Sequence, residues 1–161
     1  EGEVGFVYAG LHGFFQGLDQ IVRAAERLKG EPVRFLFFGD GAEKERLVRA
    51  AQRMKLSNIN FYPPLPHAEV GPVLASMDVA IVPLRKTILG SVPSKIYEAM
   101  ASGVPVLLVA NGEASEIVQR AGAGVTVDPG DIDGLALKIR EMACQPTWRE
   151  RMDLSIRRRG V

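Results

Sequence analysis

The chain has 161 residues, of which 47% are hydrophobic and 24% are charged, a composition typical of one folded globular domain and not of a disordered chain. Lys and Arg total 20 while Asp and Glu total 19, so the net charge of +1 gives no global electrostatic case for a nucleic-acid partner. The single cysteine, Cys144, excludes an internal disulfide framework and a cysteine-based metal cluster.

Six short apolar runs predict buried strands at residues 4–9, 33–38, 59–62, 79–82, 106–109 and 124–127. Between them, apolar residues recur every three or four positions over 18–28, 47–54 and 132–142, which predicts helices with one buried face. Several strands are apolar at every position, as in a parallel sheet that helices cover on both faces. We therefore expect one domain over residues 1–161 with an α/β, doubly wound, Rossmann-like fold and a mostly parallel sheet.

The second half of the chain adds signals at its ends. Asp131 follows a turn and is an N-cap candidate for the last of these helices, and Trp148, Met152 and Ile156 have the spacing of one face of a further, final helix.

No apolar run approaches the roughly 20 residues that a membrane helix needs, so we expect a soluble, cytoplasmic protein. The chain starts at Glu1 without an initiator methionine, which favours a piece of a longer protein.

The loops that follow the strands are where an open α/β sheet binds its ligand. The first reads Tyr8-Ala9-Gly10-Leu11-His12-Gly13 and is followed by Gly17. Glycines let the backbone come close to a ligand ahead of a helix N-terminus, which suits a phosphate. Their spacing differs from the dinucleotide fingerprint, so a nicotinamide cofactor is disfavoured, and a plain turn remains an equal alternative.

Three polar residues near the loops receive structural interpretations. Asp40 lies in the second loop, Gly39-Asp40-Gly41, and is interpreted as an N-cap, because its short carboxylate can accept hydrogen bonds from free helical amides. His12 is interpreted as a loop hydrogen-bonder, and His67 as structural. Neither histidine has a metal partner at ligand spacing.

A third segment is predicted to form a helix that opens at Pro93, after an aperiodic candidate loop at residues 83–92. Folding alone does not explain Lys95, because the helix dipole repels a cation in the first turn unless an anion such as phosphate binds there. Glu98 lies one turn after Ser94, where its carboxylate can accept hydrogen bonds from two ribose hydroxyls if it faces the cleft. A pair of solvated surface charges remains the alternative.

Seven short motifs follow one another along the chain: Tyr8-Ala9-Gly10, Gly39-Asp40-Gly41, Pro64-Leu65, Asp78-Val79 with Pro83, Pro93 to Glu98, Gly103-Val104-Pro105-Val106 and Gly112-Glu113-Ala114-Ser115-Glu116. In this order the motifs resemble the glycosyl transferases group 1 superfamily, the retaining enzymes of GT-B architecture, over nearly the whole chain. Gly13 with Gln16-Gly17-Leu18 is similar to a branch of bacterial transferases of acetamido sugars such as N-acetylfucosamine.

The resemblance implies that this domain binds the sugar-nucleotide donor, with Lys95 as the catalytic charge on the departing diphosphate. Gly90 and Gln16 depart from the family, since many members have an acidic residue near the sugar and a diphosphate-binding lysine at these positions. Arg85 and Lys86 are alternatives to Lys95. The implied donor-binding residues, with no metal ligand among them, are Gly10, His12, Gly13, Gly39, Asp40, Gly41, Pro64, Leu65, Ser94, Lys95 and Glu98, where Glu98 is the ribose carboxylate and Pro64-Leu65 the edge beside the base.

The implied reaction moves a sugar from a nucleoside diphosphate sugar, with UDP favoured, to a polysaccharide or lipid-linked acceptor. It retains the anomeric configuration and uses no cofactor and no protein-bound metal. The expected partners are the nucleotide sugar and an N-terminal acceptor domain absent from this chain, without nucleic acid; peripheral contact with the inner face of the membrane stays open. Two alternatives remain, half of a nucleotide-sugar epimerase of the same architecture and a non-enzymatic α/β signalling domain, which ranks last because Asp40 lacks acidic neighbours.

Overall fold

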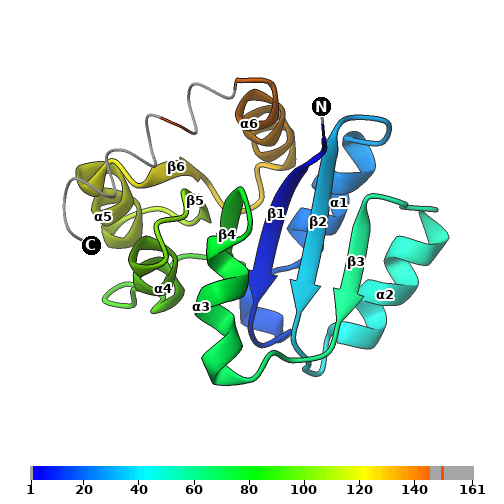
Figure 1. Cartoon of the computed structure of the whole chain (residues 1–161), viewed down its shortest axis with the longest axis horizontal. Helices are drawn as coiled ribbons and strands as arrows, with labels where there is room; N and C mark the ends of the chain where they lie inside the picture. Colours follow the sequence, from blue (N-terminus) through cyan, green and yellow to red (C-terminus); the bar gives the residue numbers. More distant parts are fainter. Residues whose placement is uncertain (1, 146–149, 151–161) are drawn as a thin grey trace.

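The protein is built on a sheet of six parallel strands (Figure 1). The structure is a computed structural model that describes residues 2–145 and 150. Across the sheet the strands run in the order β3-β2-β1-β4-β5-β6, which is the α/β doubly wound arrangement expected from the sequence. The strands are β1 Val4–Ala9, β2 Val33–Phe38, β3 Ile59–Tyr62, β4 Val79–Pro83, β5 Val106–Val109 and β6 Gly124–Val127.

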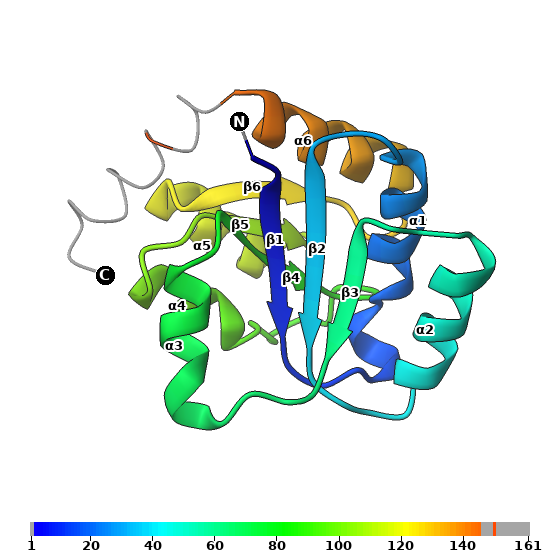
Figure 2. The same ribbon diagram turned by 45° about the vertical axis from the view of Figure 1, so that its right-hand side comes forward.

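Helices cover both faces of the sheet (Figures 1 and 2). On one face, α1 Asp19–Arg27 contacts both α2 Lys44–Arg53 and α6 Ile132–Cys144. The other face carries α3 His67–Ala75, α4 Lys95–Ala101 and α5 Glu113–Ala121, while a 3-10 turn, η1 Phe14–Gln16, links β1 to α1. Among the described residues, no helix has both the length and the apolar composition that crossing a membrane requires.

Side chains that alternate along β1 divide the core into two layers. Phe6 and Tyr8 point toward α1 and α2 and pack with aromatic residues of β2, among them Phe37. Val7 points to the opposite layer, which smaller aliphatic residues of β4, β5, α4 and α5 fill. Both layers are stabilised by burial of apolar surface, which contributes roughly 25 cal/mol per Å².

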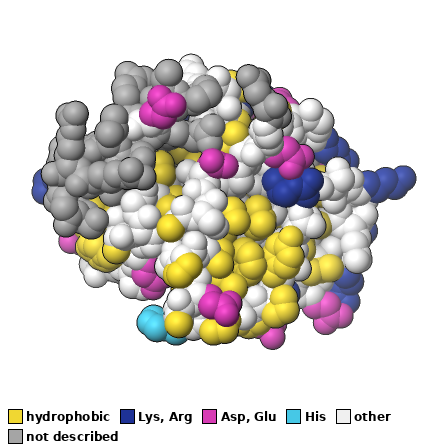
Figure 3. All heavy atoms as spheres, viewed as in Figure 1, with side chains coloured by type: hydrophobic (Ala, Val, Ile, Leu, Met, Phe, Trp, Pro, Cys, Tyr) yellow, Lys and Arg dark blue, Asp and Glu magenta, His cyan; other side chains and the backbone are white. Residues whose placement is uncertain are grey.

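Part of the sheet has no described helix in front of it. In the view of Figure 1, β2 and β3 are open toward the viewer, and in Figure 3 hydrophobic side chains gather over the same area. Leu36 and Phe38 of β2 are only partly buried there, and Phe38 stacks on Tyr62 with ring centroids 4.8 Å apart. This apolar area leads into the cleft at the carboxyl ends of the strands, because Phe38 also lines that cleft.

The predicted strands and helices are confirmed with small shifts. All six strands lie where expected, and β4 is one residue longer because it includes Pro83. The helices expected over 18–28, 47–54 and 132–142 are α1, α2 and α6. Asp131 caps α6, since its carboxylate accepts a hydrogen bond of 2.9 Å from the Gly134 amide. The predicted final helix with Trp148, Met152 and Ile156 lies outside the described residues.

Two helices, α3 and α5, were not predicted, and one helix start differs. α3 contains Gly71 and Pro72, which lower its helix propensity, so its local sequence resembles a loop. In α5 only Ala114 and Val118 are buried, which gives a weak apolar period. α4 begins at Lys95, two residues after the expected start at Pro93.

β1 and β4 separate toward their carboxyl ends. The β1–β4 ladder pairs Phe6 with Val79 and Val7 with Ala80, whereas the β1–β2 ladder continues to Ala9 and Phe38. The strand order also reverses at this point, since β2 lies on one side of β1 and β4 on the other. Open α/β sheets bind their ligands in the crevice at such a position.

Candidate functional site

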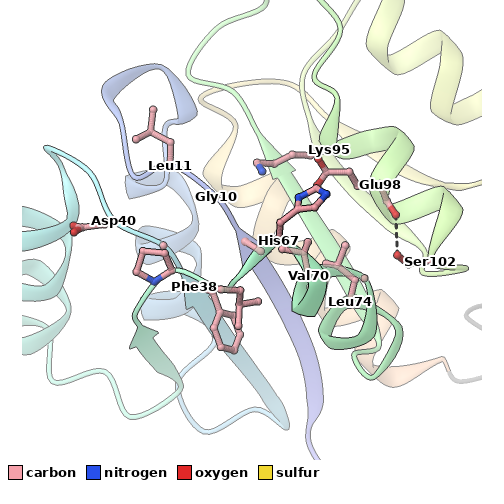
Figure 4. A pocket seen from close by; sticks show the side chains of 15 residues that line it. Gly10, Leu11, Phe38, Asp40, His67, Val70, Leu74, Lys95, Glu98 and Ser102 are labelled. Carbon is pink, nitrogen blue, oxygen red and sulfur yellow. Dashed lines mark hydrogen bonds between the residues drawn. The ribbon is translucent and has the colours of Figure 1, made fainter.

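A cleft of about 620 Å³ lies at this edge of the sheet (Figure 4). Loops after β1, β2 and β3 form one wall, and α3 and α4 form the other. The lining residues divide by chemistry, with charged groups on α4 and apolar groups on α3 and the β3–α3 loop. They are Ala9, Gly10, Leu11, Phe38, Gly39, Asp40, Pro64, Leu65, His67, Val70, Gly71, Leu74, Lys95, Glu98 and Ser102.

The α4 wall brings a cation and a carboxylate to the cleft. Lys95 is half-buried and its chain crosses Gly10 so closely that a Cβ there would collide with its Cε and Nζ atoms. Its Nζ lies 5.8 Å from the centre of the Tyr8 ring. Glu98, one helical turn further, is exposed in the same cleft. Among residues 2–145 and 150, neither charge takes part in an ion pair, so both remain available to a ligand.

The two glycine-rich loops interlock through their backbones. The Gly10 amide donates to the Phe38 carbonyl at 2.9 Å and the His12 amide donates to the Asp40 carbonyl at 2.8 Å, which extends the β1–β2 ladder beyond the strands. These two amides are therefore occupied. The amides of Leu11 and Gly13 donate to no group within the described part of the chain. In the predicted phosphate-binding loop, the N–H groups of Leu11 and Gly13 are therefore the two that remain free to bind a phosphate.

His12 lies beneath this loop and not in the cleft. Its side chain is fully buried among Tyr8, Phe37 and Phe61, with ring centroids 5.7 to 6.4 Å from its own. Nδ1 is 3.0 Å from the carbonyl oxygen of Gly10. Burial lowers the pKa of His12, because the charged ring would lose its hydration. Its interpretation as a loop hydrogen-bonder is confirmed.

Asp40 does not cap α2, so the N-cap interpretation is wrong. The residue before α2 is Glu43, and Asp40 instead accepts a hydrogen bond of 2.8 Å from the Gly41 amide. Asp40 lines the cleft on the loop after β2, but its exposed carboxylate is turned away from Lys95 (Figure 4). Lys44 holds two carbonyls at this edge of the sheet: its Nζ donates to that of Gly39, directly after β2, at 2.6 Å and to that of Tyr62, the last residue of β3, at 2.9 Å.

The apolar end of the cleft contains residues that the sequence did not single out. Pro64 and Leu65 lie there as expected, joined by Val70 and Leu74 of α3. His67, the first residue of α3, is exposed and lines the cleft, a position that its structural interpretation did not anticipate. A predicted helix at this place would have brought the side chains of Val70 and Leu74 to one face, one turn apart. Gly71 and Pro72 lower the helix propensity of the segment, so the helix was not predicted.

The alternative cation Arg85 is committed elsewhere. Its guanidinium contacts Asp19 at 2.7 Å and donates to the Phe14 carbonyl at 2.8 Å, and its Cζ lies 4.1 Å from the centre of the Phe14 ring. Lys86 is exposed and, like Gly90, lies outside the residues that line the cleft. Lys95 is thus the lysine that the structure brings to the cleft.

The structure brings together seven of the eleven predicted donor-binding residues. Gly10, Gly39, Asp40, Pro64, Leu65, Lys95 and Glu98 line the cleft. His12, Gly13, Gly41 and Ser94 lie outside its lining, next to residues that do line it. The ligand contacts of all eleven stay predictions. Within the described ranges, no three His, Cys, Asp or Glu side chains are grouped as metal ligands.

Comparisons with known proteins identify the family and the fold of the chain. The model of the family "Glycosyl transferases group 1" matches residues 3–159. A probable glycosyltransferase of Pseudomonas aeruginosa, WbjE, is 35% identical over 85% of this chain, which spans 35% of that protein. In three dimensions the chain is similar to WaaG, a glycosyltransferase involved in lipopolysaccharide biosynthesis, with a TM-score of 0.84 and 17% identity over 98% of this chain and 42% of that one.

A second solved structure has the same fold. It is HepE from Anabaena in complex with UDP-glucose, with a TM-score of 0.79 and 19% identity over 95% of this chain and 42% of that one. The chain thus spans about a third to two fifths of the length of the proteins that it matches. The family model matches nearly the whole chain, and this chain therefore belongs to the glycosyl transferases group 1 family.

Proposed function

We propose that the cleft binds the nucleoside diphosphate of a sugar donor, and that the whole protein transfers this sugar with retention of the anomeric configuration. The observation that carries the proposal is the convergence of the unpaired Lys95 and Glu98 with Leu11, whose backbone amide is free, in one crevice; the free amide of Gly13 lies next to this lining. Each group matches a different part of the donor. The proposal therefore makes separate predictions for the ribose and the diphosphate.

Glu98 accepts hydrogen bonds from the two ribose hydroxyls, for which a carboxylate has two suitable oxygens. Lys95 and the amides of Leu11 and Gly13 hold the diphosphate. During transfer the bond between the anomeric carbon and the diphosphate oxygen breaks, and negative charge grows on the diphosphate. A fixed ammonium and fixed N–H dipoles stabilise that charge more in the transition state than in the ground state. Lys95 is in this sense the catalytic residue of the domain.

The base lies at the apolar end, beside Pro64 and Leu65. Uracil is our proposed base, supported by the UDP-glucose held in HepE. Transfer to a polysaccharide or lipid-linked acceptor is supported by the role of WaaG in lipopolysaccharide biosynthesis. We place the acceptor site and the general acid and base in another part of the full-length protein. An acetamido sugar as the donor sugar rests on the resemblance of residues 13–18 alone.

The test is calorimetric titration of the chain with UDP-glucose, UDP and uridine. We expect UDP-glucose and UDP to bind, uridine to bind more weakly, and no sugar to be transferred by residues 1–161 alone. Chelation by EDTA leaves the affinities unchanged, because the proposed charge stabilisation uses Lys95 and backbone amides. Absence of UDP binding, or affinity that is lost with EDTA and restored by Mg²⁺ or Mn²⁺, contradicts the proposal. Release of an epimerised sugar by the full-length protein would favour the epimerase alternative.

A further inference from the structure

The peptide between Gly10 and Leu11 is the feature of the cleft that most needs to be held in place. A trans peptide is planar, and its C=O and N–H point in opposite directions. If the Leu11 N–H faces the cleft, the Gly10 carbonyl faces the interior; if the plane turns over, the carbonyl oxygen faces the ligand. Gly10 has no Cβ to restrict this rotation. An oxygen turned toward a diphosphate would repel it.

Three hydrogen bonds fix the successive peptides of the loop. His12 Nδ1 lies 3.0 Å from the Gly10 carbonyl oxygen, the Tyr8 hydroxyl donates to the Leu11 carbonyl at 2.5 Å, and the Glu43 amide donates to the His12 carbonyl at 2.9 Å. Each bond holds a carbonyl, so each aims the N–H at the other side of its peptide plane. The N–H groups of Leu11 and Gly13 are the two that remain unpaired.

The His12 bond also determines the state of its ring. A carbonyl oxygen can only accept, so Nδ1 carries the proton and donates to Gly10. Nε2 is buried and meets no hydrogen-bond donor among the described residues. The neutral ring is favoured there, since burial lowers the pKa of His12. The imidazole therefore acts as a fixed, uncharged donor beneath the loop.

We propose that His12 is a positioning residue, which locks the Gly10–Leu11 peptide with its N–H toward the donor diphosphate. The inference rests on the proposed function, because the diphosphate is the ligand that this orientation serves. His12 touches no ligand itself. It acts through the backbone of Gly10 and Leu11, which line the cleft opposite α4 (Figure 4).

Two substitutions separate this role from simple packing. His12→Asn keeps a donor, because the Asn Nδ2 occupies a place similar to Nδ1, but it removes most of the ring from the aromatic cluster. His12→Phe keeps the ring and removes the donor. Packing alone predicts that the Asn variant is the more damaged in both stability and binding. If His12 holds the Gly10–Leu11 peptide, stability and affinity rank the two variants in opposite orders. The Phe variant is then the more stable, and the Asn variant binds UDP-glucose more tightly.

The readouts are affinity for UDP-glucose by calorimetry and stability by urea unfolding. We expect His12→Phe to bind roughly three- to tenfold more weakly than the parent chain, which is the loss of one neutral hydrogen bond. His12→Asn should bind within about twofold of the parent despite its lower stability. The proposal is overturned if the Phe variant binds as tightly as the parent, or if affinity follows stability in both variants.

Nitrogen NMR of the unsubstituted chain gives a readout that needs no ligand and no variant. We expect the His12 ring to be protonated at Nδ1 and bare at Nε2. A ring protonated at Nε2 alone overturns the lock even if UDP-glucose binds. If UDP-glucose does not bind while Nδ1 is protonated, the donor function fails but the peptide lock stands. On titration with UDP-glucose, the Leu11 and Gly13 amides should show the largest shifts, and the Leu11 shift should be lost in His12→Phe.

Discussion

The two walls of the cleft differ in kind, because one presents backbone groups and the other presents side chains. The wall made by the loops after β1 and β2 is backbone, held by hydrogen bonds between Gly10, His12, Phe38 and Asp40. The α4 wall consists of two side chains, Lys95 and Glu98, on a regular helix. A side chain added at Gly39 in the first wall must disturb the fold, whereas substitution in the second can remove one ligand contact and leave the fold intact. Stability and affinity therefore separate the two walls.

The largest effect is expected at Gly39, where the loops touch. A Cβ there would collide with the Gly10 carbonyl and lie 2.8 Å from His12 Nδ1, at a φ of +148° that side chains rarely adopt. Gly39→Ala should lower the free energy of unfolding by more than about 3 kcal/mol, since backbone cannot yield as a side chain can. Urea unfolding measures this loss.

Gly30 supplies the matched control for that substitution. It also has a positive φ, +80°, but a Cβ there would meet nothing within 4 Å. Gly30→Ala should cost only about 1–2 kcal/mol, which is the penalty of the left-handed backbone alone. Equal losses for the two variants would mean that the contact between the loops contributes nothing.

Glu98→Ala should give the next largest effect, this time on affinity. Removal of the ribose carboxylate should weaken uridine and UDP alike by roughly 1.5–3 kcal/mol, about tenfold to a hundredfold in dissociation constant. The exposed Glu113 occupies a similar first-turn position on α5, outside the cleft, so Glu113→Ala should leave both affinities unchanged. Unchanged calorimetric affinities in Glu98→Ala would show that Glu98 is a solvated surface charge and does not bind the ribose.

Lys95→Ala should give a smaller and more selective effect. It should weaken UDP by about 1 kcal/mol, on the order of fivefold, and hardly affect uridine, because the half-exposed ammonium meets only the diphosphate. The loss should shrink as salt is raised, since added ions screen exposed charges. Calorimetry at two salt concentrations measures both features. A larger loss in Lys86→Ala would identify that residue as the diphosphate cation instead.

The smallest effect is a change in how stability depends on pH. Because the pKa of His12 is lowered in the folded chain, the unfolded chain binds more protons once the pH falls through about 6.5. The contribution of His12 to stability is therefore present above that pH and is lost as the pH falls toward its folded pKa. Desolvation is the main cause; nearby Lys44 lowers the pKa further, while the hydrogen bond to Gly10 and the Asp40 charge oppose the shift.

Urea unfolding between about pH 5 and pH 8 measures this slope. His12→Phe should flatten it, because the variant has no group to protonate at that place. His67→Asn removes the exposed histidine of the other wall and should leave the contribution of His12 in place. If the free energy of unfolding depends on pH equally in the parent chain and in His12→Phe, then the pKa of His12 does not change on folding and the prediction is wrong.

Local sequence determined much of this protein. The apolar runs predicted all six strands, because a strand buried on both faces needs apolar side chains at nearly every position. The conflict between Lys95 and the dipole of its own helix pointed to an anion, since that conflict lies within one helical turn. Gly39 and Gly41 were visible as a tight loop. Each of these signals lies within a few neighbouring residues.

Only the tertiary structure decided which groups remain free to bind a ligand. The amides of Gly10 and His12 are consumed by carbonyls of β2 and its loop, a result of strand register that the sequence of the first loop does not contain. Arg85 is likewise removed from the list of cations by Asp19, 66 residues away. A binding site is made from the groups that folding leaves unpaired, and their identity depends on long-range contacts. The sequence therefore determined the six strands, four of the helices and the family, and the packing of the elements selected the cleft-lining groups.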